Sequence, residues 1–201
     1  MKANAKKASK QVAVLGLFTA LIIILQILSA FMKIGIFPLS FVLVPIVLAA
    51  NLYGIKESTI LGAVFGVVVI VCNLTGFDAL GAILTQERPV LTTVVCFLKG
   101  ALAGLAAGLM AKALKNANQY LRVLCTAIIT PVVNTGLFLL GKSLMQDTIV
   151  DSMAKLGAPT TFSAFVINII TINFAAELVI NIIVSPALPN VIKAVKRINH
   201  F

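Results

Sequence analysis

Two charged residues, Lys99 and Glu177, stand inside otherwise apolar stretches of the sequence. Charges within a membrane helix are costly and by default indicate a functional role. At 1.5 Å of rise per residue their depths differ by roughly 9 Å, which a long lysine bridges only in part. Lys99 is therefore a candidate ligand-binding residue, with a structural ion pair or a snorkelling lysine as the alternatives. For Glu177 we favour a role in structure or coupling over substrate contact.

Further polar side chains are predicted near the outer ends of the same apolar stretches. Arg88 presents a planar fork of donors that suits a carboxylate or phosphate, and Gln86 precedes it closely in the chain. Asn134 and Asn168 lie in outer halves of apolar stretches, where a buried amide without a partner costs ~1–3 kcal/mol. Hydrogen bonding between helices is the simpler explanation for any single Asn. As a set facing one cavity, these residues would bind a polar solute.

Motifs for catalysis are missing around these residues. The sequence has no P-loop, no GxSxG and no HExxH, and its single histidine is His200. Cys72, Cys96 and Cys125 lie in apolar stretches without metal-ligand spacing, so they are expected to pack in the core. We therefore expect no enzyme activity, no cofactor, no metal site and no energy source within this chain.

The elements that carry these residues have the composition of membrane spans. Of 201 residues, 60% are hydrophobic and 11% charged, and the mean hydropathy is +1.10, whereas a soluble domain has ~25% charged residues. A bilayer core of ~30 Å needs ~20 helical residues. The sequence predicts an all-α polytopic membrane protein, a single six-helix domain over residues 1–201. The expected spans cover about 11–32, 37–53, 58–74, 90–114, 120–140 and 162–184.

Two long connections separate these spans. The stretch 75–89 is predicted to be re-entrant or lid-like, and the connection that follows residue 140 holds an amphipathic piece around 144–156. Proline at 38 and 45 falls within the second predicted span, and Pro186 and Pro189 end the sixth.

Lys and Arg residues are distributed unequally between the two sides of such a bundle, which predicts its orientation. With six spans both termini share a side, and that side carries Lys2, Lys6, Lys7, Lys10, Lys56, Lys112, Lys115, Arg122, Lys193, Lys196 and Arg197. The opposite side carries Lys33, Arg88, Lys142 and Lys155. Eleven against four predicts cytoplasmic termini and external long loops. The formal net charge of +10 then reflects topology, and no nucleic-acid partner is expected.

Small residues recur at a spacing of four along three spans, which lets helix backbones approach closely. In the fourth span they are Gly100, Gly104 and Gly108, and in the third Gly62 and Gly66. We expect these two faces to pack within the bundle. Gly16 and Ala20 form a similar pair in the first span, for which packing and docking to another membrane protein are both open.

Several segments resemble a known family, the substrate-binding S components of energy-coupling factor (ECF) transporters. They are VLGLFTALIIILQ after the basic N-terminus, FPLSFVLVPIVLAANLYGIKESTILGAVFGVVV, and FLKGALAGLAAGLMAKALK. The resemblance implies a subunit of the bacterial plasma membrane that captures a vitamin from outside. It implies partners as well, a transmembrane coupling subunit and two cytoplasmic ATPases. The family docks through an AxxxA-type face on the first span, and here Gly16 and Ala20 occupy it.

The stretch QERPVLTTVVCFLKG is most similar to pantothenate-specific S components. Pantothenate would place its carboxylate on Arg88 or Lys99, its amide and hydroxyls on Gln86 and Asn134, and its methyl groups on Phe77. The chain has no Trp and only two Tyr, which disfavours flat ring ligands that gain from stacking. The alternatives are another vitamin (riboflavin, folate or a pyridoxine-related compound) and a stand-alone secondary carrier. The carrier would need ion-coupling residues or a continuous polar path.

Overall fold

The computed structural model describes residues 2–34, 37–38, 41–158 and 160–199, so His200 lies outside the described residues. The all-α prediction is confirmed, apart from an antiparallel pair of two-residue strands, β1 (Lys33–Ile34) and β2 (Phe37–Pro38). The helices are α1 (Lys2–Phe31), α2 (Leu43–Leu52), α3 (Ile55–Leu74), α4 (Ala79–Glu87), α5 (Pro89–Ala113), α6 (Gln119–Ser143), α7 (Gln146–Lys155), α8 (Phe162–Asn168), the π-helical η1 (Ile169–Phe174), α9 (Ala175–Val184) and α10 (Leu188–Asn199).

Five helical runs among the described residues are long and apolar enough to cross a membrane: Gln11–Ser29, Ile55–Leu74, Pro89–Ala113, Gln119–Ser143 and Phe162–Val184. Each satisfies its own backbone hydrogen bonds, as a lipid-exposed segment must. The prediction of a multi-pass membrane protein is supported, and these five runs match five of the six expected spans.

The second expected span, 37–53, differs from the prediction. Its helix α2 has ten residues, which at 1.5 Å per residue is about 15 Å, half the thickness of a bilayer core. Pro45 lies in the first turn of α2, where a missing N–H costs nothing. The proline therefore marks the beginning of a helix, and the chain before it forms the β1–β2 hairpin. Most of α2 is buried, including Leu43 and Ile46.

The small-residue faces of α3 and α5 pack within the bundle, as predicted, and the structure shows that they meet each other directly. A Cβ added at Gly62 would collide with the Gly100 carbonyl oxygen, and one added at Gly100 would collide with that of Gly62. Farther along the same crossing, a Cβ at Gly66 would lie 2.7 Å from the Cys96 carbonyl oxygen. These backbones touch, because glycine leaves no side chain between them.

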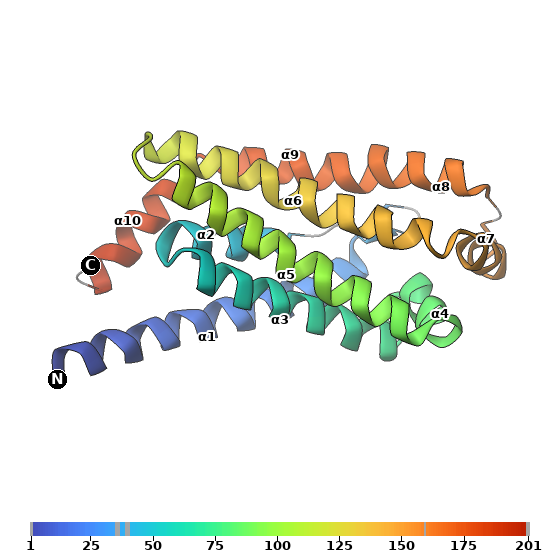
Figure 1. Ribbon diagram of the computed structural model, residues 1–201, viewed down its shortest axis with the longest axis horizontal. Coiled ribbons are helices and arrows are strands. Elements are labelled where there is room, and N and C mark those ends of the chain that lie inside the picture. The colour runs from blue at the N-terminus through green and yellow to red at the C-terminus, as the bar shows by residue number, and fades with distance from the viewer. Residues whose placement is uncertain (1, 35–36, 39–40, 159, 200–201) are drawn as a thin grey trace.

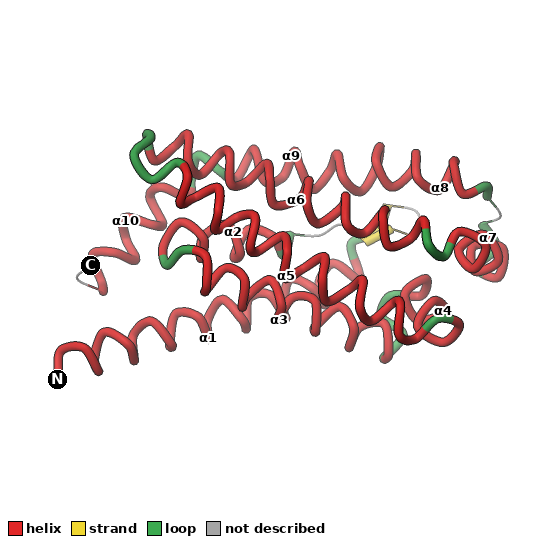
Figure 2. The backbone as a smooth tube through the Cα atoms, viewed as in Figure 1, coloured by secondary structure: helices red, strands yellow, loops and turns green. Residues whose placement is uncertain are grey.

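The bundle has two distinct ends. The N-terminus of α1 and the amphipathic α10 lie at one end, and α4 and α7 lie at the other (Figure 1). Figure 2 shows the β1–β2 pair in the half toward α4 and α7. The predicted re-entrant or lid-like stretch 75–89 thus contains the helix α4, and the predicted amphipathic piece around 144–156 contains the helix α7. These two helices enclose a second apolar core with α8 and η1, formed by Leu80, Leu84, Met145, Ile149, Met153, Phe165 and Ile169.

Candidate functional site

A cluster of polar side chains lies inside the apolar bundle, between α5, α6 and α9. Lys99 of α5 places its Nζ 4.8 Å from the centroid of the Phe138 ring, and Lys142 of α6 places its Nζ 5.0 Å from the same centroid. Two ammonium groups therefore lie near one phenyl ring. The Lys99 Nζ also lies 5.7 Å from the Phe65 ring of α3.

Helix geometry explains why these residues meet. Asn134, Phe138 and Lys142 are four residues apart, so they share one face of α6. At Gly141, α6 comes against Val95 of α5, since a Cβ there would lie 2.5 Å from the Val95 Cγ1. Because α5 and α6 run in opposite directions, Phe138 then lies at the level of Lys99. The close approach at Gly141 thus sets the register that brings the two lysines together.

Glu177 adds an acidic group to this cluster from α9. It is buried, and it interacts electrostatically with Lys99 and with the side-chain amide of Asn134. The π-helical segment η1 ends at Phe174, shortly before Glu177. A π-helical turn is uncommon and often occurs at functional sites, because it alters the rotation of the residues that follow. Lys99 and Glu177 are thus close enough to interact electrostatically, but they are too far apart to form an ion pair.

Several polar atoms of the cluster lack partners. Within the described part of the chain, the only ion pair joins Lys155 to Glu87, outside the cluster. Lys142 is 2% exposed. The Asn134 Oδ1 and Glu177 Oε2 atoms are buried without a hydrogen-bond partner. Leaving such groups unmatched costs ~1–3 kcal/mol each, and more when they are charged. This arrangement is typical of a site that a polar ligand completes.

The structure brings two of the six predicted ligand residues, Lys99 and Asn134, into this cluster. Gln86 and Arg88 are exposed at the junction of α4 and α5, and Arg88 begins α5 about 16 Å along the axis from Lys99. Phe77, which is 45% exposed, lies just before α4. These three roles stay predictions.

Asn168, the sixth predicted residue, is exposed on α8. Its Nδ2 donates to the Ala164 carbonyl oxygen at 2.9 Å, within its own helix. Its role in binding also stays a prediction.

Lys142 is the residue that sequence reasoning missed. The count of basic residues assigned it to an external loop, whereas it lies within α6 and is buried against Phe138. The spacing of Asn134, Phe138 and Lys142 would have indicated the shared face, had α6 been extended past residue 140. The charge of Lys142 made a loop position the natural expectation, because lysine is rarely buried.

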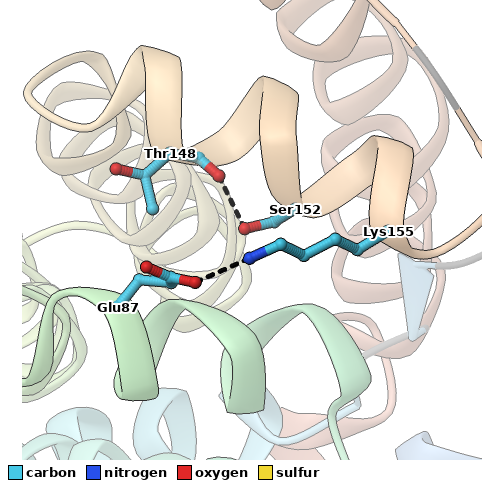
Figure 3. Close-up of polar contacts among 4 residues, drawn as sticks. All are labelled: Glu87, Thr148, Ser152 and Lys155. Carbon is cyan, nitrogen blue, oxygen red and sulfur yellow. Dashed lines mark hydrogen bonds and ion pairs between the residues drawn. The ribbon is translucent and has the colours of Figure 1, made fainter.

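The end of the bundle nearest the cluster is covered by α4 and α7, which an exposed ion pair connects. The Lys155 Nζ donates to the Glu87 Oε1 at 2.6 Å, and both side chains are about half exposed (Figure 3). The hydrogen bond from Lys155 lowers the pKa of Glu87, and the same bond raises the pKa of Lys155. Farther inside, the Thr92 Oγ1 donates to the Leu84 carbonyl oxygen at 2.9 Å and so ties α5 to α4.

Gly16 and Ala20, the predicted docking pair, lie together on an exposed face of α1. A Cβ at Gly16 would meet nothing within 4 Å. Phe18 and Ile22, on the opposite face, are buried in the core. The small-residue face of α1 is thus turned away from this bundle.

The comparisons with known proteins identify the family. A model of the family described as ECF transporter, substrate-specific component, matches residues 10–189. The chain belongs to this family. It is accordingly a substrate-binding subunit of an ECF transporter, a membrane protein that binds a small molecule and works with the other subunits of that transporter. No curated protein and no solved structure matches the chain.

Among the described residues, no group of three or more His, Cys, Asp or Glu side chains could hold a metal ion. Cys72, Cys96 and Cys125 are free thiols.

Proposed function

We propose that this protein is the pantothenate-binding S component of an ECF transporter and that the cluster around Lys99 is its ligand site. The observation that supports this is the presence of two lysines inside an apolar bundle, Lys142 buried and Lys99 partly buried, neither of which forms an ion pair with a carboxylate among the described residues. Charges at such positions are expensive unless function requires them. Pantothenate offers one carboxylate, an amide, two hydroxyls and a gem-dimethyl group, and Phe138 and Phe65 provide apolar surface for the methyl groups.

The proposed topology has six crossings with both termini in the cytoplasm of a bacterium. The short helix α2, together with the hairpin before it, serves as the second crossing, shielded from lipid by its neighbours. Both ends of the chain lie opposite α4 and α7 (Figure 1), which supports a shared side. Removing the buried Lys142 from the outer count leaves eleven basic residues against three, so the charge asymmetry increases. The helices α4 and α7 then face outward.

The proposed route for the ligand begins at these outer helices. Gln86 and Arg88 are exposed there, where a positive charge attracts an anion and raises its rate of association. Phe77 and Asn168 lie exposed in the same half of the bundle, on the connection before α4 and on α8. The anion then moves inward to the lysines.

Energy for uptake comes from the partners in this proposal. The exposed face of Gly16 and Ala20 packs against the transmembrane coupling subunit, which carries two ATPases. Small residues permit close contact between helices in lipid, where packing replaces the hydrophobic effect.

Mass spectrometry of the small molecule that co-purifies with the protein in mild detergent tests the vitamin assignment. We expect pantothenate. If riboflavin, folate or a pyridoxine-related vitamin co-purifies instead, the protein is still an S component, but its ligand is that vitamin and not pantothenate.

Uptake by proteoliposomes tests the class of transporter. We expect no uptake of radiolabelled pantothenate by the protein alone, and ATP-dependent uptake once the coupling subunit and both ATPases are added. Uptake by the protein alone would identify a secondary carrier.

A further inference from the structure

Lys142 is buried but forms no ion pair with any of the residues that the structure describes. Its side chain is 2% exposed, and its Nζ lies 5.0 Å from the centroid of the Phe138 ring. An ammonium over an aromatic face recovers only part of the hydration that burial removes. Asp78 interacts with it electrostatically, but the Asp78 Oδ1 accepts a hydrogen bond from the Gly81 N–H at 3.0 Å and caps α4. An additional negative charge beside Lys142 would therefore lower the energy of the folded protein.

Lys99 provides the second positive charge at the same place. Both ammonium groups lie near the Phe138 ring, which limits their separation to about 10 Å, and they repel each other. A carboxylate between them would receive hydrogen bonds from both, and it would cancel the repulsion. Charge-assisted hydrogen bonds of this kind are about twice as strong as neutral ones.

The inner side of the cluster requires hydrogen-bond donors from a ligand, whereas the two lysines require a negative charge. The Asn134 Oδ1 and the Glu177 Oε2 are acceptors without donors. Asn134 precedes Phe138 by one helical turn, away from Lys142. A ligand that reaches them must present hydroxyl or amide N–H groups. The cluster therefore has a cationic outer part and an accepting inner part.

We propose that Lys99 and Lys142 jointly bind the carboxylate of the transported molecule beside the Phe138 ring, while Asn134 and Glu177 accept hydrogen bonds from its neutral end. The substrate class is a small monocarboxylate whose other end carries hydroxyl or amide donors. This inference rests on the proposed function. It adds that the ligand binds with its carboxylate toward the outer side and that Lys142 determines specificity for that carboxylate.

Pantothenate and panthenol test the proposal directly, because they differ only where a carboxylate is replaced by a primary alcohol. Calorimetry on the purified protein measures both affinities. We expect the protein to bind pantothenate about 10-fold or more tightly than panthenol, as the loss of a charged hydrogen bond implies. Lys142→Met should remove this preference by weakening pantothenate alone. Asn134→Ala should weaken both compounds to a similar degree.

A matched control and a stability measurement guard against misfolding. Lys115→Met removes one positive charge from the exposed turn between α5 and α6 and should preserve both affinities. Without ligand, Lys142→Met should unfold at the same or a higher temperature than the unmodified protein, because a buried unpaired charge has been replaced by an apolar side chain of similar length.

The outcomes separate the inference from the proposed function. If Lys142→Met keeps the full preference for pantothenate, the two-lysine site is wrong while the vitamin assignment stands. A co-purifying vitamin without a carboxylate would overturn both the two-lysine site and the pantothenate assignment, but not membership of the transporter. If another carboxylate vitamin co-purifies, the same comparison with its carboxamide decides the inference. If no small molecule binds the unmodified protein, the proposed function and the inference fail together.

Discussion

Gly100→Ala probes the contact that holds α3 and α5 together. The added methyl group would collide with the Gly62 carbonyl oxygen and lie 3.0 Å from the Gly66 backbone nitrogen and 3.2 Å from the Phe65 Cδ1. Two of these neighbours are backbone atoms of a packed helix, so relief requires the helices to separate. Overpacking of this kind costs ~1–3 kcal/mol, and the better helix propensity of alanine returns ~0.5–1 kcal/mol. We expect a net destabilisation of up to about 2.5 kcal/mol, with a central value of roughly 1 kcal/mol.

Gly136→Ala is the matched control on α6. A Cβ at Gly136 meets nothing within 4 Å, so only the propensity term applies, and the variant should be as stable as the unmodified protein or slightly more so. Thermal unfolding in detergent, followed by circular dichroism, compares the two variants under identical conditions. The calorimetric affinity for pantothenate should fall in Gly100→Ala, since Lys99 adjoins the displaced residue. Equal midpoints for the two variants would refute the close backbone contact.

Three further predictions concern the surface of the bundle. Gly16→Leu or Ala20→Leu should abolish ATP-driven uptake in proteoliposomes and preserve pantothenate affinity; loss of affinity would contradict a role limited to docking. Arg88→Ala should slow pantothenate association several-fold at low salt, with a smaller effect at high salt, in stopped-flow measurements; a salt-independent change in dissociation would place Arg88 within the site. The Glu87–Lys155 ion pair should be fully formed between the ordinary pKa values of the two side chains, about 4.3 and about 10.4, and should weaken only outside that range. Because folding lowers the pKa of Glu87, the stabilisation from the ion pair is lost as the pH falls through the pKa of Glu87 in the folded protein. Because folding raises the pKa of Lys155, the stabilisation is also lost as the pH rises through the pKa of Lys155 in the folded protein. Cross-relaxation between α4 and α7 in NMR spectra checks this range, and loss near neutral pH would contradict it.

Long apolar runs could be recognised as helices from the sequence because a span in lipid must satisfy every backbone group internally. The same reasoning overestimated the second span. It counted 37–53 as one helix, whereas α2 begins at Leu43 and the hairpin precedes it. Apolar composition alone does not separate a lipid-facing span from a short helix buried among neighbours, since both environments exclude water.

Intramembrane charge drew attention to Lys99 and Glu177, and the structure brings both into one cluster with Asn134. Lys142 was assigned to the wrong environment, because the end of α6 was placed before it. Whether a terminal residue of a helix faces water or the core depends on what packs beside that turn. Here the answer comes from Val95, which meets Gly141 on a different helix.

The sequence by itself determined the membrane character, five of the long helices, the packing of the glycine faces of α3 and α5 within the bundle, and the resemblance to the S-component family. These features depend on local composition and on spacing within one helix, which a linear sequence records. Only the tertiary structure decided that α2 is a short buried helix, that α4 and α7 join through Glu87 and Lys155, and that Lys142 and Lys99 both lie near the Phe138 ring. Those features depend on the register between helices distant in the chain, and close packing of their side chains sets that register.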